Sequence, residues 1–154
     1  MKTKFYAAYG SNINIQQMSG RCPEATICNN GFINGYKLTF RSGGFANIEK
    51  SENCRVPVVL WKITERCERN LDRYEGYPGF YKKTELPVEL EEGTQTAMVY
   101  VMNDDAKGKF RLPAEYYYYE IQDGYEDNGL PLDYLEKALD ECKAEVVKGG
   151  NYNG

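Results

Sequence analysis

The amino-acid sequence predicts an α+β fold in which a mixed β-sheet curls into a barrel, with helices inserted between strands and at the C-terminal end. Two observations lead to this prediction. Runs rich in β-branched and aromatic residues alternate with turn sequences through most of the chain. The last part instead spaces its apolar residues at helical intervals. With 154 residues the chain fits one core, so residues 1–154 are expected to form a single domain.

The first element is a predicted strand that leads into a tight turn. Lys4–Tyr9 is a short β-like run, and it stops at Gly10-Ser11-Asn12, a sequence typical of turns. Ile13–Gly20 then has the length of one or two helical turns. A strand, a turn and a short helix are therefore expected at the N-terminal end.

Several strands follow. Asn34-Gly35 is a strong two-residue hairpin signal, and it predicts paired strands over Ala25–Ile33 and Tyr36–Arg41. After a flexible glycine pair, Phe45–Ile48 is a short extended segment. Val56–Ile63 is dense in β-branched and aromatic residues, which favours a central strand.

The middle of the chain switches to helical spacing before two further strands. Thr64–Tyr74 is a predicted helix, with Thr64 as its N-cap and Gly76 as its C-terminal stop. Phe80–Glu91 and Thr96–Met102 are then predicted strands that meet at the turn Glu92-Gly93.

The C-terminal part predicts two helices after a charged loop at Asn103–Arg111. Pro113 opens the first helix and Asn128-Gly129 ends it, and its apolar stripe contains Ala114, Tyr118, Ile121 and Tyr125. Pro131 opens the second helix, and a mobile tail is expected at 149–154.

Composition excludes several classes of function. The chain has no histidine, so it cannot build a Ser-His-Asp or Cys-His catalytic set or a zinc site with histidine ligands. The net charge of −4, without a basic block, argues against nucleic acid as a partner. Apolar runs are too short to cross a bilayer, and the N-terminus does not resemble a secretory signal. A cytoplasmic enzyme that transfers protons through carboxyl, amine, phenol or thiol groups fits this composition.

Five cysteines are present, an odd number without a C-x-x-C pair. Neither a disulfide framework nor a zinc site is indicated, and reduced thiols are expected. A nucleophilic cysteine is disfavoured, because no cysteine lies in a motif that would lower its pKa.

Glu75 is the candidate acid–base residue. It lies where the predicted helix ends, between Tyr74 and Gly76. The negative end of a helix and burial among aromatic rings both raise a carboxyl pKa, and a raised pKa suits a general base in a chain without histidine. The alternative is a solvated surface glutamate.

The turn Tyr9-Gly10-Ser11-Asn12 is the candidate anchor for a substrate. Glycine allows close approach of a ligand to the backbone, and successive N–H groups in such a turn can converge on an anion. The alternative is an ordinary strand-to-helix turn in which Asn12 caps the helix. Among the 14 tyrosines, Tyr116 and Tyr119 lie off the apolar stripe, so one of them could point into a cleft.

Several motifs follow one another along the chain. YGSN comes after a first strand, Gly43-Gly44 precedes Ala-Asn-Ile, and Val-Val-Leu-Trp-Lys-Ile occupies 58–63. LDRYEGYPGFY at 71–81 and DNGLPLDY at 127–134 come next. Together and in this order, these motifs resemble the γ-glutamylcyclotransferase family, and the resemblance spans nearly the whole chain.

The resemblance implies a cofactor-free and metal-free enzyme that cyclises a γ-glutamyl amide, from a γ-glutamyl-amino acid or a γ-glutamylamine, to 5-oxoproline with release of the amine. This is a lyase-type acyl transfer of glutathione metabolism, in a monomer or small homo-oligomer. Glu75 would accept and donate the proton. The implied substrate-binding residues are Tyr9, Gly10, Ser11, Asn12, Ile13, Asn14, Tyr81, Tyr100 and Tyr116.

Three departures from the family pattern bear on the substrate. Tyr77-Pro78 is more similar to the branch that acts on γ-glutamylamines, Ile13 replaces a leucine or methionine, and Asn47 replaces a threonine or alanine. The alternative function is a binding or regulatory module that keeps the fold and the pocket without catalysis.

Overall fold

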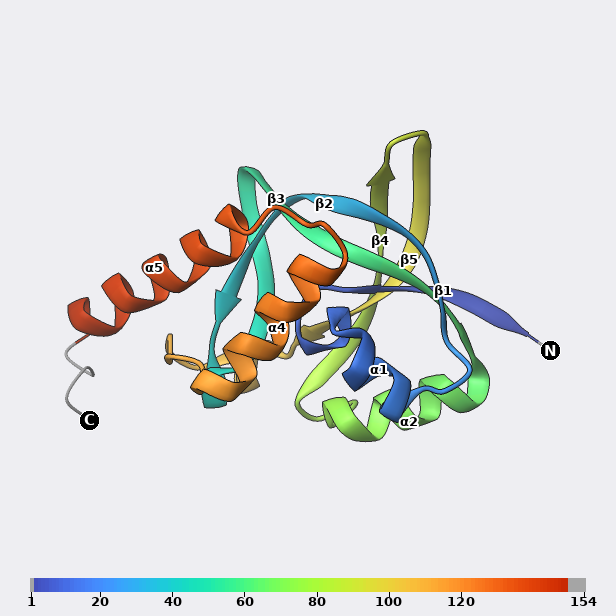
Figure 1. The fold of residues 1–154 in the computed structure, drawn as a ribbon. Coiled ribbons are helices and arrows are strands. Elements are labelled where there is room, and N and C mark those ends of the chain that lie inside the picture. Colours follow the sequence, from blue (N-terminus) through green and yellow to red (C-terminus); the bar gives the residue numbers. More distant parts are fainter. Residues whose placement is uncertain (1, 150–154) are drawn as a thin grey trace.

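A computed structural model of the chain describes residues 2–149, in which five strands close into a barrel (Figure 1). The strands are β1 (Thr3–Ala8), β2 (Thr26–Phe40), β3 (Ala46–Thr64), β4 (Tyr81–Leu90) and β5 (Gly93–Met102). Their order around the barrel is β1-β3-β2-β4-β5. The β1–β5 pair is parallel and the other pairs are antiparallel, so the sheet is mixed. The predicted fold class is confirmed.

The long strand β3 is the central one, because it pairs with β1 on one side and with β2 on the other. Residues 56–61 of β3 are all buried, which fits the β-branched and aromatic side chains there. The prediction that Val56–Ile63 is a central strand is confirmed. The strand begins earlier than expected and includes most of the short segment predicted at Phe45–Ile48.

The hairpin predicted at Asn34-Gly35 is wrong. Strand β2 continues through these residues, and its pairing with β3 shifts register between Asn34 and Tyr36. Gly35 has φ of +79°, and a bulge that needs positive φ favours the same residues as a two-residue turn. The chain instead reverses at the short 3-10 segment η2 (Ser42–Gly44).

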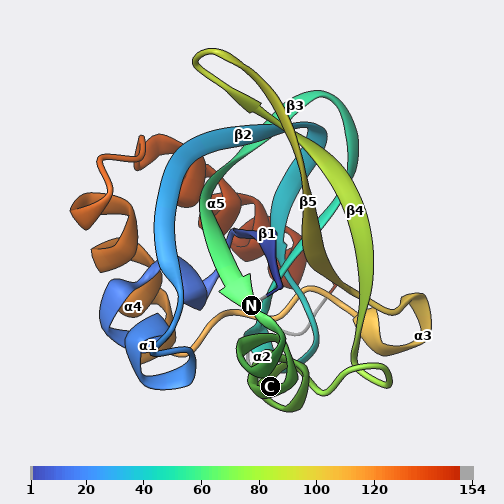
Figure 2. The same cartoon turned by 90° about the vertical axis from the view of Figure 1, so that its right-hand side faces the viewer.

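Helices cover the barrel on its outer side and at one end (Figure 2). They are η1 (Ser11–Ile13), α1 (Ile15–Arg21), α2 (Glu65–Glu75), α3 (Asp104–Lys107), α4 (Glu115–Asp127) and α5 (Asp133–Lys148). Helix α5 packs on β2, α4 packs on η1, and α1 contacts α2. The short helix α3 lies in the segment predicted as a loop.

The ends of α2 follow the prediction. The Thr64 side chain accepts a hydrogen bond from the Cys67 N–H, and Gly76 ends the helix in the left-handed conformation with φ of +65°. Helices α4 and α5 each begin two residues after the proline predicted to open them. For α4 the reason is that Ala114 keeps an extended backbone and is the N-cap residue.

The expectation that all five cysteines are reduced is wrong. Cys22, at the end of α1, and Cys67, in the first turn of α2, form a disulfide bond with their Cα atoms 5.0 Å apart. These residues are 45 positions apart, and only the packing of α1 against α2 brings them together. Neither an odd count nor the absence of C-x-x-C excludes such a pair. Cys28, Cys54 and Cys142 are free thiols.

Two further predictions concern membranes and the tail. Within residues 2–149, no helix combines the length and the apolar character needed to span a bilayer. The predicted mobile tail at 149–154 lies outside the described residues except for Gly149, which is the C-cap residue of α5.

Candidate active site

A cavity of about 260 Å³ opens beside the end of β1, between the C-terminal end of α2 and the first turn of α4. Strands β4 and β5 each contribute a tyrosine to its wall. The lining residues are Tyr6, Tyr9, Gly10, Ser11, Asn12, Phe45, Ala46, Arg73, Tyr74, Glu75, Gly76, Phe80, Tyr81, Tyr100 and Tyr117. Its size suits a small ligand.

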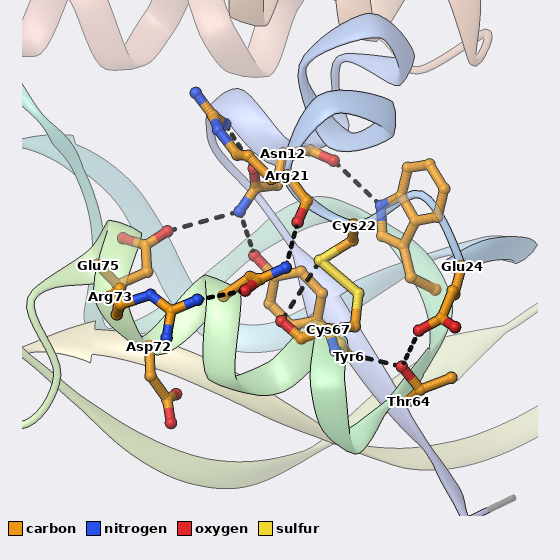
Figure 3. The surroundings of a disulfide bond; sticks show 12 residues. Tyr6, Asn12, Arg21, Cys22, Glu24, Thr64, Cys67, Asp72, Arg73 and Glu75 are labelled. Carbon is orange, nitrogen blue, oxygen red and sulfur yellow. Dashed lines mark hydrogen bonds between the residues drawn. A yellow bond between two sulfur atoms is a disulfide. The ribbon is translucent and has the colours of Figure 1, made fainter.

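Glu75 lies in this cavity, as the last residue of α2. Its side chain is partly buried, and loss of water around the carboxylate raises the pKa of Glu75 to about 7. The nearby cation of Arg21 opposes this rise. The Asn12 amide Nδ2 makes a long contact of 3.5 Å with Glu75 Oε1 (Figure 3). The structure therefore holds a carboxyl group near neutral pKa against the first turn.

The turn after β1 faces Glu75, and all four residues of the predicted anchor, Tyr9–Asn12, line the cavity. The Trp61 indole N–H donates to the Asn12 carbonyl at 3.0 Å. Ile13 and Asn14 are buried but are not among the lining residues. Asn14 caps α1 by accepting from the Gln17 N–H, so the helix cap is Asn14 rather than Asn12.

The tyrosines of the cavity are held by hydrogen bonds to the protein. The Tyr9 hydroxyl donates to the Tyr100 carbonyl at 2.6 Å, and the Tyr81 hydroxyl donates to the Ala46 carbonyl at 2.7 Å. The Tyr100 hydroxyl donates to Asp72 at 2.6 Å. Burial raises the pKa of Tyr9, Tyr81 and Tyr100, so these phenols are neutral at neutral pH.

Sequence comparison places this site in a known family. The model of the family "Gamma-glutamyl cyclotransferase, AIG2-like" matches residues 6–120, which include the first turn and Glu75. The chain belongs to this family.

Individual members of the γ-glutamyl cyclotransferase family match over most of the chain. The gamma-glutamylcyclotransferase of Homo sapiens is 32% identical over 161 residues, which cover 97% of this chain and 81% of the human protein. The Mus musculus protein of the same name is 31% identical over 148 residues, 88% of this chain and 77% of its own. A solved structure named gamma-glutamyl cyclotransferase has a TM-score of 0.79 and 30% identity, and the match covers 89% of this chain and 86% of that one.

In this γ-glutamyl cyclotransferase family member, the tyrosine that α4 places at the cavity is Tyr117. Tyr116 is 69% exposed, whereas Tyr117 is 7% exposed and lines the cavity. Ile121 and Tyr125 of the predicted apolar stripe of α4 are buried as expected, but Tyr117 is buried in place of Tyr118, and a step of one residue turns a side chain by about 100° around a helix. Tyr119, the other tyrosine considered for the cleft, is 54% exposed.

Two further residues of the site were not predicted from the sequence. Tyr6 lines the cavity from β1, and its hydroxyl accepts from Asn12 Nδ2 at 2.9 Å. No local pattern identifies Tyr6, because Tyr6, Ala7 and Ala8 are all buried and this part of β1 does not alternate between buried and exposed residues. Arg21 reaches the first turn from the last residue of α1. No local pattern identifies Arg21, because its position depends on how α1 packs.

Proposed function

We propose that this family member cyclises a γ-glutamyl amide to 5-oxoproline and releases the free amine, with Glu75 as the acid–base residue. The observation that supports this role is the partly buried Glu75 carboxyl, with a pKa raised to about 7, inside a cavity lined by polar donors. In a chain without histidine, this group has the pKa that proton transfer at neutral pH requires.

The reaction needs no outside nucleophile. The α-amine of the γ-glutamyl group attacks the side-chain amide carbon of the same molecule, and a five-membered lactam forms. Because the reacting amine and amide belong to one molecule, no encounter of two molecules is needed. Holding these two groups close together can lower the barrier by roughly 7–11 kcal/mol. The walls of the cavity would supply this confinement.

Glu75 would carry the proton between the two nitrogen atoms. The α-amine is protonated at neutral pH, so the ionised Glu75 carboxylate first accepts a proton from it. The free amine then forms the new C–N bond, and a tetrahedral intermediate results. As the original C–N bond breaks, protonated Glu75 donates to the leaving nitrogen. The regenerated carboxylate then takes the second proton from the new ring nitrogen and passes it to the released amine, which leaves as an ammonium ion, so the carboxylate is restored and neither water nor an oxidant enters the balance.

Donors around the cavity fit the charges of this reaction. The N–H groups of the first turn, at Gly10–Asn12, can hold the substrate carboxylate or the oxyanion that develops in the intermediate. The hydroxyls of Tyr6 and Tyr117 each accept a hydrogen bond from the protein, so their own protons are available for a ligand. Burial raises the pKa of both phenols, which keeps them protonated.

The direct test is an assay of the purified chain against γ-glutamyl dipeptides, γ-glutamylamines and glutathione, with 5-oxoproline, free glutamate and the released amine quantified. We expect 5-oxoproline and amine in equal amounts with at least one substrate, and no glutamate. Measurable affinity for these compounds without 5-oxoproline release would overturn the proposal and would favour the binding module considered above. Release of glutamate would indicate hydrolysis and would also contradict it.

A further inference from the structure

Arg21 connects the parts of the chain that meet at the cavity. It is the last residue of α1, and its guanidinium donates to Asn12 Oδ1 at 2.6 Å and to Ser11 Oγ at 3.1 Å. On the other side, the guanidinium donates to the Tyr74 hydroxyl at 2.6 Å and lies 3.6 Å from the centre of the Tyr74 ring. One side chain thus joins the turn after β1 to the last turn of α2, next to Glu75.

The contact with Arg21 determines which way the Asn12 amide faces. An asparagine amide has one oxygen, which accepts, and one NH₂ group, which can donate twice. Arg21 occupies the oxygen, so the NH₂ group faces the cavity, where it contacts Tyr6 Oη at 2.9 Å and Glu75 Oε1 at 3.5 Å (Figure 3). Without the guanidinium, the amide loses the interaction that selects this orientation.

The backbone of Arg21 is itself fixed to α2. The Asn70 side chain donates to the Arg21 carbonyl at 3.1 Å. The next residue, Cys22, is bonded to Cys67, and Figure 3 shows this disulfide beneath the Arg21 backbone. The guanidinium therefore extends from a backbone position held at two points, which suits a side chain that orients others.

Among residues 2–149, Arg21 is one of two cations near the Glu75 carboxylate. The groups that face Glu75 from the surrounding elements are the phenols of Tyr6, Tyr9, Tyr81, Tyr100, Tyr117 and Tyr74 and the guanidinium groups of Arg21 and Arg73. Arg73 is exposed and donates to Asn70 Oδ1, directed away from the carboxylate. The cationic field at Glu75 therefore comes mainly from Arg21, which lowers the Glu75 pKa against the effect of burial.

We propose that Arg21 is a positioning residue for the cyclisation, which holds the Asn12 amide toward Glu75 and supplies the positive charge beside which Glu75 ionises. The proposal rests on the acid–base role proposed for Glu75. Arg21 is not a catalytic residue in this account, since it acts through Asn12 and through its charge.

Two variants separate the effect of the Arg21 charge from the effect of its guanidinium contacts with Asn12 and Tyr74. Arg21→Gln removes the cation, so a larger share of Glu75 is protonated at neutral pH, and the acidic limb of the kcat/KM profile is expected to move to higher pH. Arg21→Lys keeps the charge and is expected to leave this limb near its wild-type position. Both lose the planar contact with Asn12 and Tyr74, so kcat is expected to fall roughly ten- to a hundredfold, with KM less affected.

The control is Arg66→Gln, which removes an exposed cation from α2, far along the helix from Glu75. It is expected to change neither kcat nor the pH profile. Thermal unfolding of all variants identifies any loss of fold. If Arg21→Gln folds and shows the wild-type kcat and the wild-type pH profile, Arg21 does not position the site and the proposal is overturned.

A titration that needs no activity distinguishes this proposal from the proposed function. The chain is labelled with glutamate carrying ¹³C at the side-chain carboxyl, and the Glu75 resonance is assigned by its absence in Glu75→Gln. We expect the Glu75 midpoint to rise in Arg21→Gln and to remain unchanged in Arg66→Gln. An unchanged midpoint in Arg21→Gln contradicts the electrostatic role even if the wild type forms 5-oxoproline. A raised midpoint supports that role even if no substrate is turned over.

Discussion

The hydroxyl of Tyr9 donates a hydrogen bond of 2.6 Å to the main-chain carbonyl of Tyr100, 91 residues further along the chain. Both residues line the cavity, and the bond joins the end of β1 to β5 where the barrel closes. It is buried, as are both side chains. This hydrogen bond therefore links the wall of the cavity to the contact between β1 and β5 that closes the barrel.

Tyr9→Phe tests this relationship. It removes the donor and leaves the ring, so the free energy of unfolding is expected to fall by about 1 kcal/mol, measured by urea denaturation. Tyr119→Phe is the matched control, because that hydroxyl is on a residue that is 54% exposed, and no measurable change is expected there. Equal effects of the two substitutions would show that the buried bond contributes nothing.

The position of α4 predicts which of two adjacent tyrosines matters for turnover. Tyr117 lines the cavity and accepts from the Ala46 N–H at 3.0 Å, whereas Tyr116 is exposed. Tyr117→Phe is expected to lower kcat/KM at least roughly tenfold, since it removes a hydroxyl that lines the cavity and whose proton is available to a substrate. Tyr116→Phe is expected to leave kcat/KM unchanged. The opposite ranking in a 5-oxoproline assay would refute this assignment.

Gly124 controls the distance between α4 and the first turn. A Cβ atom at Gly124 would lie 2.7 Å from Ile13 Cγ2 and 2.8 Å from the Asn14 nitrogen, so Gly124→Ala would push α4 away from η1. We expect a loss of about 1–3 kcal/mol in the free energy of unfolding and lower turnover. Gly20→Ala is the control, because no atom lies within 4 Å of the added Cβ. In helix α1 it should stabilise by about 0.5–1 kcal/mol.

The raised pKa of Glu75 predicts how stability depends on pH. Between pH 4.5 and about 7 the folded chain retains a proton that the unfolded chain has lost, so this group lowers the free energy of unfolding as pH rises. Glu75→Gln removes this cost, and the variant is expected to be more stable than wild type at about pH 8, by about 1–3 kcal/mol. Below pH 4.5 the difference should vanish. Chemical denaturation of both proteins at about pH 8 and below pH 4.5 measures this difference in the free energy of unfolding.

Glu65→Gln is the control for this pH effect. Glu65 is an exposed residue in the first turn of α2, where the helix dipole favours a negative charge. No gain in stability at high pH is expected from this substitution. A gain equal to that of Glu75→Gln would mean that general charge reduction, and not burial of Glu75, determines the result.

Local patterns in the sequence predicted the features that depend on neighbouring residues. The dense run at Val56–Ile63 identified the central strand, and Thr64 and Gly76 identified both ends of α2, which position Glu75. These signals are local because caps and β-branched runs act on the backbone nearest to them. The bulge at Gly35 was mistaken for a turn because both need the same backbone conformation.

Features that depend on packing could not be predicted from the sequence. The Cys22–Cys67 bond and the reach of Arg21 toward Asn12 both require the contact of α1 with α2. Tyr117 was missed because the stripe of α4 is determined by η1, on which the helix packs, and the tyrosine run gives no contrast between its faces. The side chains that complete the site therefore come from separate elements, whereas Glu75, the proposed acid–base residue, lies at a helix end that local signals identify.

The most direct measurement is the rate of 5-oxoproline release by Glu75→Gln, compared with wild type and with Glu65→Gln, on the best substrate found. Binding of that substrate by each variant is measured by calorimetry. The account predicts that Glu75→Gln folds and binds the substrate but forms no 5-oxoproline above background, while Glu65→Gln keeps wild-type turnover. Turnover by Glu75→Gln close to that of wild type would contradict it.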